Sequence, residues 1–155
     1  MNSTTALFFL AFATLYSCNK AEKLNETVTT PTTEVAEQKP VTECYIMATP
    51  RDTVTMTMTR QNQSVSGDLR YNWYEKDHNV GTYKGSFMGD TLRIGYTFQS
   101  EGMTSIREEL FLLKGDELIK GTGHIIEKNG RQVFENKKNV IFDGSIVLTK
   151  TDCKN

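Results

Sequence analysis

Residues 52–60 read DTVTMTMTR, and within this stretch the apolar residues Val54, Met56 and Met58 alternate with threonines. A period of two is typical of a β-strand, because successive side chains of a strand point to opposite faces of the sheet. The threonines are polar and β-branched, which suits the face that meets water. The stretch therefore predicts a strand with one buried face.

The same alternation recurs along residues 43–155. It predicts further strands at residues 65–73, 81–87, 92–98, 106–113 and 118–126, and leaves residues 131–139 ambiguous. The strands are separated by pairs that favour tight turns, namely Gly89-Asp90, Gly115-Asp116 and Asn129-Gly130. About eight consecutive antiparallel strands indicate an all-β fold, either a sandwich or an up-and-down barrel.

The N-terminal segment has a different pattern. Residues 1–17 carry no charged side chain, and the apolar run at residues 6–15 (ALFFLAFATL) is shorter than the roughly 20 residues that a membrane-spanning helix needs. The run fits the core of a signal peptide, although a buried N-terminal helix is the alternative. Leu15-Tyr16-Ser17-Cys18 resembles the lipobox of bacterial lipoproteins. The resemblance implies a signal peptide over residues 1–17, acylation of Cys18 and a permanent membrane anchor.

Residues 18–42 predict a tether between the anchor and the folded domain. Residues 19–42 contain six Thr, two Pro, four Glu, three Lys and no aromatic residue, so they bury too little apolar surface to fold. A flexible coil of this length spans about 25 to 30 Å. Asn19 stands where, in the sorting rule of some lipoproteins, Asp retains the protein at the inner membrane. The resemblance therefore implies a location in the cell envelope, at the outer membrane.

Besides Cys18 the chain contains two cysteines, Cys44 in a first strand expected just after Glu43 and Cys153 after the last predicted strand. The cell envelope permits disulfides. The first and last strands of a closed barrel are neighbours, so a bond between these cysteines would join the ends of the domain at the closure. We therefore expect one antiparallel meander of about eight strands in residues 43–155, closed or nearly closed into a barrel. Two unpaired buried thiols are the alternative.

The alternation also predicts which side chains point into the barrel. They are mostly large and apolar: Leu69, Tyr71, Trp73, Tyr83, Phe87, Leu92, Ile94, Tyr96, Phe98, Ile106, Leu110 and Leu112. Eight strands enclose a space that side chains fill or that holds one small ligand. The aromatic members Tyr71, Trp73, Tyr83 and Tyr96 therefore either line a ligand pocket or pack the core.

Glu108 interrupts the apolar series between Ile106 and Leu110. An inward carboxylate has to be paired, protonated or bound to a ligand, which makes Glu108 a candidate binding residue. In the alternative phase of this strand, the inward residues are Arg107, Glu109, Phe111 and Leu113.

Composition and motifs exclude several classes of function. The 18 basic and 19 acidic residues nearly cancel, so there is no basic field for nucleic acid. His78 and His124 lack metal-ligand spacing, and no serine lies in an elbow-like motif for a nucleophile. We therefore expect no enzyme, no catalytic residue, no metal and no cofactor.

Two functions stay open. The organisation resembles the small lipocalin-like (calycin) barrels of envelope lipoproteins, which implies binding of a small apolar or amphipathic ligand. We expect the protein to be a monomer. Tyr71, Trp73, Tyr83, Tyr96 and Glu108 would line its cavity. A barrel lipoprotein closed by a disulfide is also similar to the membrane-bound lysozyme inhibitors. That reading implies a packed core and a protein or cell-wall partner at loops 75–80 and 99–104.

Overall fold

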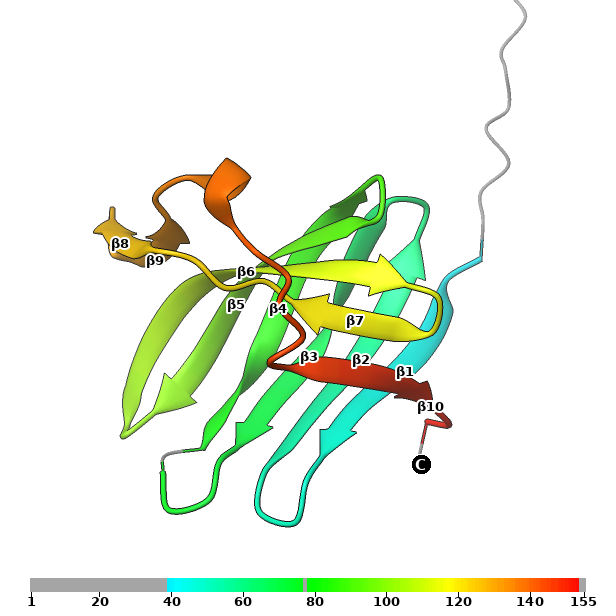
Figure 1. The fold of residues 1–155 in the computed structure, drawn as a ribbon, viewed down its shortest axis with the longest axis horizontal. Helices are drawn as coiled ribbons and strands as arrows, with labels where there is room; N and C mark the ends of the chain where they lie inside the picture. Colours follow the sequence, from blue (N-terminus) through cyan, green and yellow to red (C-terminus); the bar gives the residue numbers. More distant parts are fainter. Residues whose placement is uncertain (1–38, 77, 154–155) are drawn as a thin grey trace, which may run out of the picture. The chain divides into compact units, whose positions relative to one another are not determined.

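The computed structural model describes residues 39–76 and 78–153, which form an all-β domain (Figure 1). Its strands are β1 (Val41–Ala48), β2 (Thr53–Gln61), β3 (Ser64–Asn72), β4 (Asn79–Met88), β5 (Thr91–Ser100), β6 (Met103–Lys114), β7 (Glu117–Lys120), β8 (Ile125–Lys128), β9 (Arg131–Phe134) and β10 (Val147–Thr151). One 3₁₀ turn, η1 (Lys137–Asn139), follows β9.

The expected signal peptide, Cys18 and the tether up to residue 38 lie outside the described residues. The first strand begins at Val41, two residues before the expected start of the domain at Glu43. Among the residues described, there is no helix with the length and apolar character that crossing a membrane requires.

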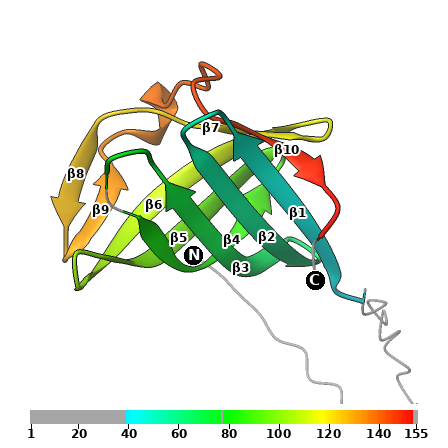
Figure 2. The same cartoon turned by 90° about the horizontal axis from the view of Figure 1, so that it is seen from below.

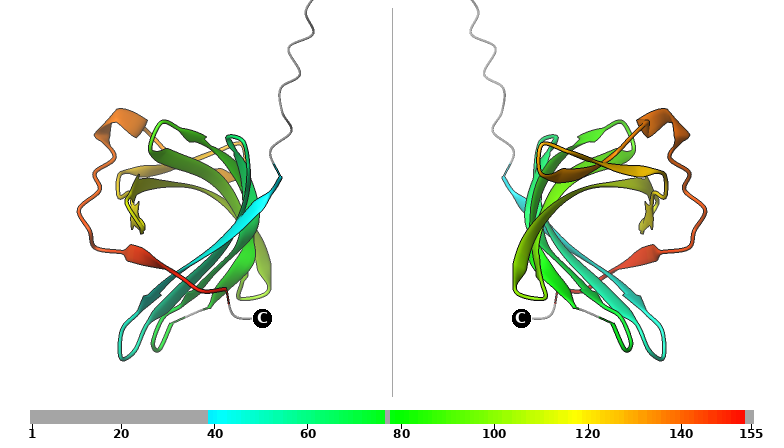
Figure 3. Two further views of the ribbon diagram at one scale, coloured as in Figure 1. Left: turned by 90° about the vertical axis from the view of Figure 1, so that its right-hand side faces the viewer. Right: turned by 90° about the vertical axis from the view of Figure 1, so that its left-hand side faces the viewer.

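Eight of the strands close into an antiparallel barrel (Figure 3). Strands β1 to β6 each pair with the next strand in sequence, and β10 pairs with both β7 and β1. The predicted closed barrel is confirmed. The meander is interrupted after β7, because the chain forms the β8–β9 hairpin before it returns to the barrel as β10. This hairpin joins β6 through one parallel pairing, Arg107 with Gln132, and Figure 2 shows it beside β6.

The single strand expected at residues 118–126 is therefore wrong. Gly121 and Gly123 mark the point where the chain leaves the barrel. A side chain at Gly121 would force a neighbour to shift, and one at Gly123 would make a tight contact. A Cβ on Gly121 would lie 2.5 Å from Val140 Cγ1, and one on Gly123 would lie 3.1 Å from Phe134 Cδ1. The expected hairpin turn beyond them is confirmed, since Asn129 and Gly130 have φ angles of 54° and 70°.

The barrel closes between β1 and β10, where the predicted disulfide is confirmed. Cys44 pairs in register with Thr151, and Cys153 follows two residues later. The Cα atoms of Cys44 and Cys153 lie 5.2 Å apart, across 109 residues of sequence. In the part of the chain that the structure describes, the strand pairings and the disulfide lie within residues 41–153, and residues 36–155 form one compact unit.

The core follows the predicted alternation on β2 to β5 but not on β6. Partners across an antiparallel pair share a face, and buried Ile94 and Tyr96 pair with Glu109 and Arg107. The odd-numbered residues of β6 therefore point inward, which is the alternative phase. The inward positions expected for Ile106, Leu110 and Leu112 are wrong, because both faces of β6 carry apolar residues and the sequence does not choose between them. Leu110 is nevertheless buried at the outer surface.

Close contact between strands requires glycine at Gly85 on β4. A Cβ there would lie 2.0 Å from the carbonyl oxygen of Arg93, whereas a Cβ on Gly95 of β5 has no neighbour nearer than 3.9 Å. We expect Gly85→Ala to lower the free energy of unfolding by about 1 to 3 kcal/mol or more, and Gly95→Ala to change it by less than about 1 kcal/mol. Urea denaturation of both variants checks this, and equal effects would contradict the strand packing described here.

Candidate functional site

A charged pair lies inside the barrel, near the end where β6 begins. The Arg107 guanidinium donates to Glu109 Oε1 from Nε at 2.8 Å and from a terminal nitrogen at 2.6 Å. The Tyr71 hydroxyl donates to the second carboxylate oxygen of Glu109. Glu109 is 1% exposed, so these hydrogen bonds take the place of the water that would otherwise solvate its carboxylate.

The surroundings fix the charge state of this cluster. Burial, followed by the negative charge of Glu109, raises the pKa of Tyr71 well above its usual value and also raises the pKa of Tyr96. Burial alone would lower the pKa of Arg107, but the charge and hydrogen bonds of Glu109 outweigh it and the pKa is raised. Near neutral pH the tyrosines therefore stay neutral donors and Arg107 stays charged.

Two cations converge on the ring of Tyr71. The guanidinium carbon of Arg107 lies 5.7 Å from the ring centroid, and Nζ of Lys120, at the end of β7, lies 5.8 Å from it. The electron-rich face of an aromatic ring attracts both. Lys120 makes no ion pair with the residues that the structure describes. Around this ring, two positive charges thus meet the single carboxylate of Glu109.

Glu108 points the other way, to the outer face of β6, where the hairpin covers it and leaves it 7% exposed. Its carboxylate accepts Arg93 Nε at 2.5 Å and the Phe134 backbone N–H at 3.2 Å, and Lys137 Nζ lies 3.3 Å away. These partners come from β5, β9 and η1. Glu108 therefore fastens the β8–β9 hairpin and η1 to the barrel wall.

We expect Glu108→Gln to loosen the hairpin without opening the barrel. A neutral amide weakens the contacts to Arg93 and Lys137, and the backbone attaches the hairpin to β6 at one pairing only. Hydrogen exchange at the amides of β8 and β9 should accelerate by about tenfold, whereas exchange in β2 and β3 should not change. Equal acceleration in all four strands would show that Glu108 supports the whole fold instead.

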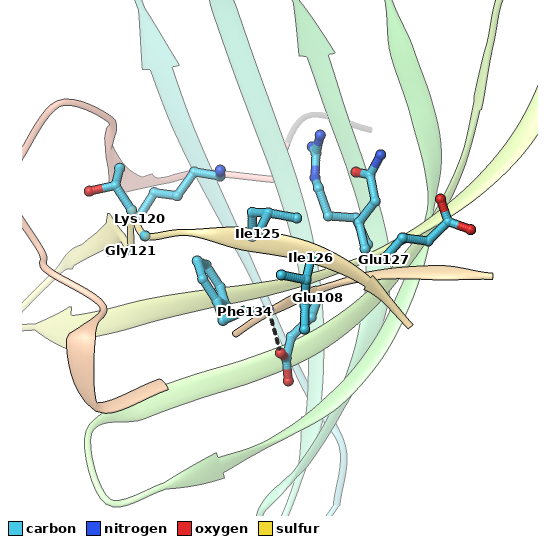
Figure 4. Close-up of a pocket in the computed structure, with 11 residues that line it drawn as sticks. Glu108, Lys120, Gly121, Ile125, Ile126, Glu127 and Phe134 are labelled. Atoms are coloured by element: carbon cyan, nitrogen blue, oxygen red, sulfur yellow. Dashed lines mark hydrogen bonds between the residues drawn. The ribbon is translucent and has the colours of Figure 1, made fainter. Parts of the chain in front are cut away.

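Between the hairpin and the end of the barrel lies a hollow of about 480 Å³, here called the hairpin hollow (Figure 4). Its lining residues are Arg107, Glu108, Lys120, Gly121, Thr122, Gly123, Ile125, Ile126, Glu127, Gln132 and Phe134. Ile125, Ile126 and Phe134 provide apolar walls, and Arg107 and Lys120 provide positive charge. The volume lies within the range of about 300 to 1,000 Å³ that is typical of small-molecule sites.

The structure places the predicted site residues in two different environments, the barrel core and the hairpin hollow. Tyr71, Tyr83 and Tyr96 are buried in the core, and Trp73 packs against it, stacked on Tyr71 at 5.7 Å between ring centroids. The hydroxyls of Tyr83 and Tyr96 donate to the backbone oxygens of Thr57 and Leu69 at 3.0 and 2.8 Å. None of the four aromatic residues lines the hairpin hollow. Glu108 lines it, but from the outer face of β6.

Arg107, Lys120 and the hairpin residues were not candidates from sequence. The break at Gly121-Thr122-Gly123 in an expected strand is the signal that could have indicated them. The predicted loop at residues 99–104 is also shorter than expected, because only Glu101 and Gly102 separate β5 from β6. Tyr74 stands near the start of the other loop, 49% exposed, with the Arg51 guanidinium 4.8 Å from its ring.

The fold and the site together define an antiparallel eight-stranded β-barrel with a hairpin-covered hollow at one end. In the described ranges, no group of three or more His, Cys, Asp or Glu side chains is placed to hold a metal ion. Comparisons with protein families, with curated proteins and with solved structures find no match for this chain.

Proposed function

We propose that this protein is a bacterial envelope lipoprotein, anchored through Cys18, whose barrel binds a small amphipathic ligand in the hairpin hollow. One observation carries the proposal: the hollow combines the apolar walls of Ile125, Ile126 and Phe134 with the charged groups of Arg107 and Lys120. An amphipathic molecule needs both kinds of surface, and a hollow of about 480 Å³ has room for one.

The proposal places the ligand beneath the hairpin and not in the middle of the barrel. Tyr71, Tyr83 and Tyr96 are each at most 2% exposed, and their hydroxyls are engaged by protein acceptors. A ligand at the centre would have to displace these contacts. The hairpin hollow is already open to solvent, and loosening of the hairpin would widen it further.

A second candidate function is an interaction or inhibitor module that binds a protein or cell-wall partner. The packed core favours it, because a barrel without a ligand inside can serve as a rigid support for loops. Exposed Tyr74, with Arg51 at its ring, is the kind of aromatic anchor that protein interfaces use.

Native mass spectrometry of residues 36–155, produced in the envelope of the native host, tests the choice. The fragment must begin before Val41 so that β1 stays whole. A co-purifying small molecule at one copy per chain supports the ligand-binding function. A chain of the bare sequence mass, both before and after lipid extraction of the sample, favours the interaction module.

The anchor needs a separate test. Metabolic labelling with a radioactive fatty acid should label the wild-type chain, and the label should disappear in Cys18→Ala. A Cys44→Ala variant is the matched control and should keep the label, because that cysteine forms the disulfide. A labelled Cys18→Ala chain would refute the lipoprotein assignment.

A further inference from the structure

We propose that the ligand of the hairpin hollow is a carboxylate amphiphile, whose anionic group binds between Arg107 and Lys120. This inference rests on the proposed function and specifies the ligand class of the same site. It follows from the balance of charge in the hollow and from the hydrogen-bonding groups that the fold leaves available there.

The positive charges of the hollow are only partly neutralised. Arg107 and Lys120 both lie within 6 Å of the Tyr71 ring centroid, and Glu109 is the carboxylate that pairs with Arg107 beneath them. Arg107 is only 24% exposed, so water screens its charge less than that of a surface residue. An anion from solution would restore neutrality at this point.

Donors are also available in excess. A guanidinium has five N–H groups, and Arg107 uses Nε and one terminal nitrogen toward Glu109. The ammonium of Lys120 has three N–H groups and makes no ion pair within the described ranges. A carboxylate with two acceptor oxygens can accept from both side chains at once.

The acidic groups of the hollow offer much less to a cation. Glu108 already accepts from Arg93 and Phe134 and lies near Lys137, so its negative charge is matched by two cations. Glu127 is exposed at the rim on β8, where water screens it. An ammonium ligand would therefore be repelled by Arg107 and Lys120 and would have no unpaired carboxylate inside the hollow to bind.

The apolar part of such a ligand has a surface to lie on. The hollow is bordered by Ile125 and Ile126 of β8 and by Phe134 of β9. Figure 4 shows Lys120 and Phe134 near these two isoleucines. Ile125 is 38% exposed, so a hydrocarbon chain placed against it would remove apolar surface from water. A short fatty acid matches both the charge and the walls.

Titration calorimetry on residues 36–155 with octanoate, octan-1-ol and octylammonium tests this inference, because the three probes share a chain and differ in charge. We expect octanoate to bind at least about tenfold tighter than the other two. Equal binding of octanol, or tighter binding of octylammonium, would overturn the carboxylate inference and leave the amphiphile site standing. If none of the three binds, the proposed function itself fails.

Variants test whether Lys120 is the cation that attracts octanoate. Lys120→Gln should weaken octanoate about tenfold and leave octanol unchanged, whereas Lys120→Arg should keep most of the octanoate affinity. Lys114→Gln is the control, because it changes the net charge by the same amount as Lys120→Gln. Lys114 is exposed at the C-terminal end of β6 and does not line the hollow. Loss of octanoate binding in Lys114→Gln to the same extent would mean that overall charge, not this site, attracts the anion.

Discussion

Replacement of Arg107 by methionine should lower the free energy of unfolding by about 3 to 5 kcal/mol, the loss typical of a buried ion pair with one partner removed. The reason is that the buried carboxylate of Glu109 would lose its cationic partner. Glu109 is 1% exposed and would keep only the Tyr71 hydroxyl as a partner. Urea denaturation of the wild-type and variant barrels, with equal m-values as a check for two-state unfolding, measures the difference.

A second substitution separates the charge from the packing of the arginine side chain. In Arg107→Met with Glu109→Gln, no charge is buried, and the amide oxygen of glutamine can still accept from Tyr71. The double variant should therefore recover more than half of the lost stability. If it is as unstable as Arg107→Met alone, the loss comes from packing, and the ion pair does not stabilise the barrel.

Removal of the disulfide by the joint replacement of Cys44 and Cys153 with alanine should cost about 4 to 5 kcal/mol. The bond spans 109 residues, so it restricts the unfolded chain over nearly the whole domain. It also joins β1 to the end of β10, where the barrel closes. Thermal and urea unfolding of the double variant give the change.

Reduction of the wild-type barrel provides the control. Wild-type protein in excess dithiothreitol should unfold at the same urea concentration as the double alanine variant, and the reductant should not affect the variant. If reduction has no effect on the wild-type barrel, the strand pairing between β1 and β10 closes the barrel without help from the disulfide.

Much of the fold could be predicted because local patterns and turn chemistry agree. Val54, Met56 and Met58 of β2 are all buried, as their alternation with threonine requires. The turns at Gly89 and Gly115 use a left-handed backbone, with φ of 60° and 62°, which glycine adopts without strain. Where burial and turn geometry depend on neighbouring residues alone, the sequence was sufficient.

Long-range contacts explain what could not be predicted. The phase of β6 depends on its register with β5, since Glu108 and Glu109 are both acidic and both faces of the strand carry apolar residues. Leu110 faces outward yet is buried, and its backbone oxygen accepts from the Gly121 N–H, where the chain leaves the barrel. No periodicity of residues 106–113 contains that information, so Glu108 was expected on the inner face of the strand although it lies on the outer face.

The residues that line the hairpin hollow could be predicted only in part for the same reason. Glu108 does border a hollow, but the cations that give the hollow its character, Arg107 and Lys120, come from the inward face of β6 and from the end of β7. They meet at Tyr71 only because β6 and β7 pair and because the chain leaves the barrel at Gly121. A sequence pattern does not show that residues of two different strands come together in this way.

The central claim is that the binding site lies under the β8–β9 hairpin, and contacts measured by NMR test it most directly. With methyl-labelled residues 36–155 and octanoate, we expect intermolecular nuclear Overhauser effects from the ligand chain to the methyl groups of Ile125 and Ile126. Effects to Leu69 and Leu92 in the barrel core, with none to the hairpin isoleucines, would contradict it.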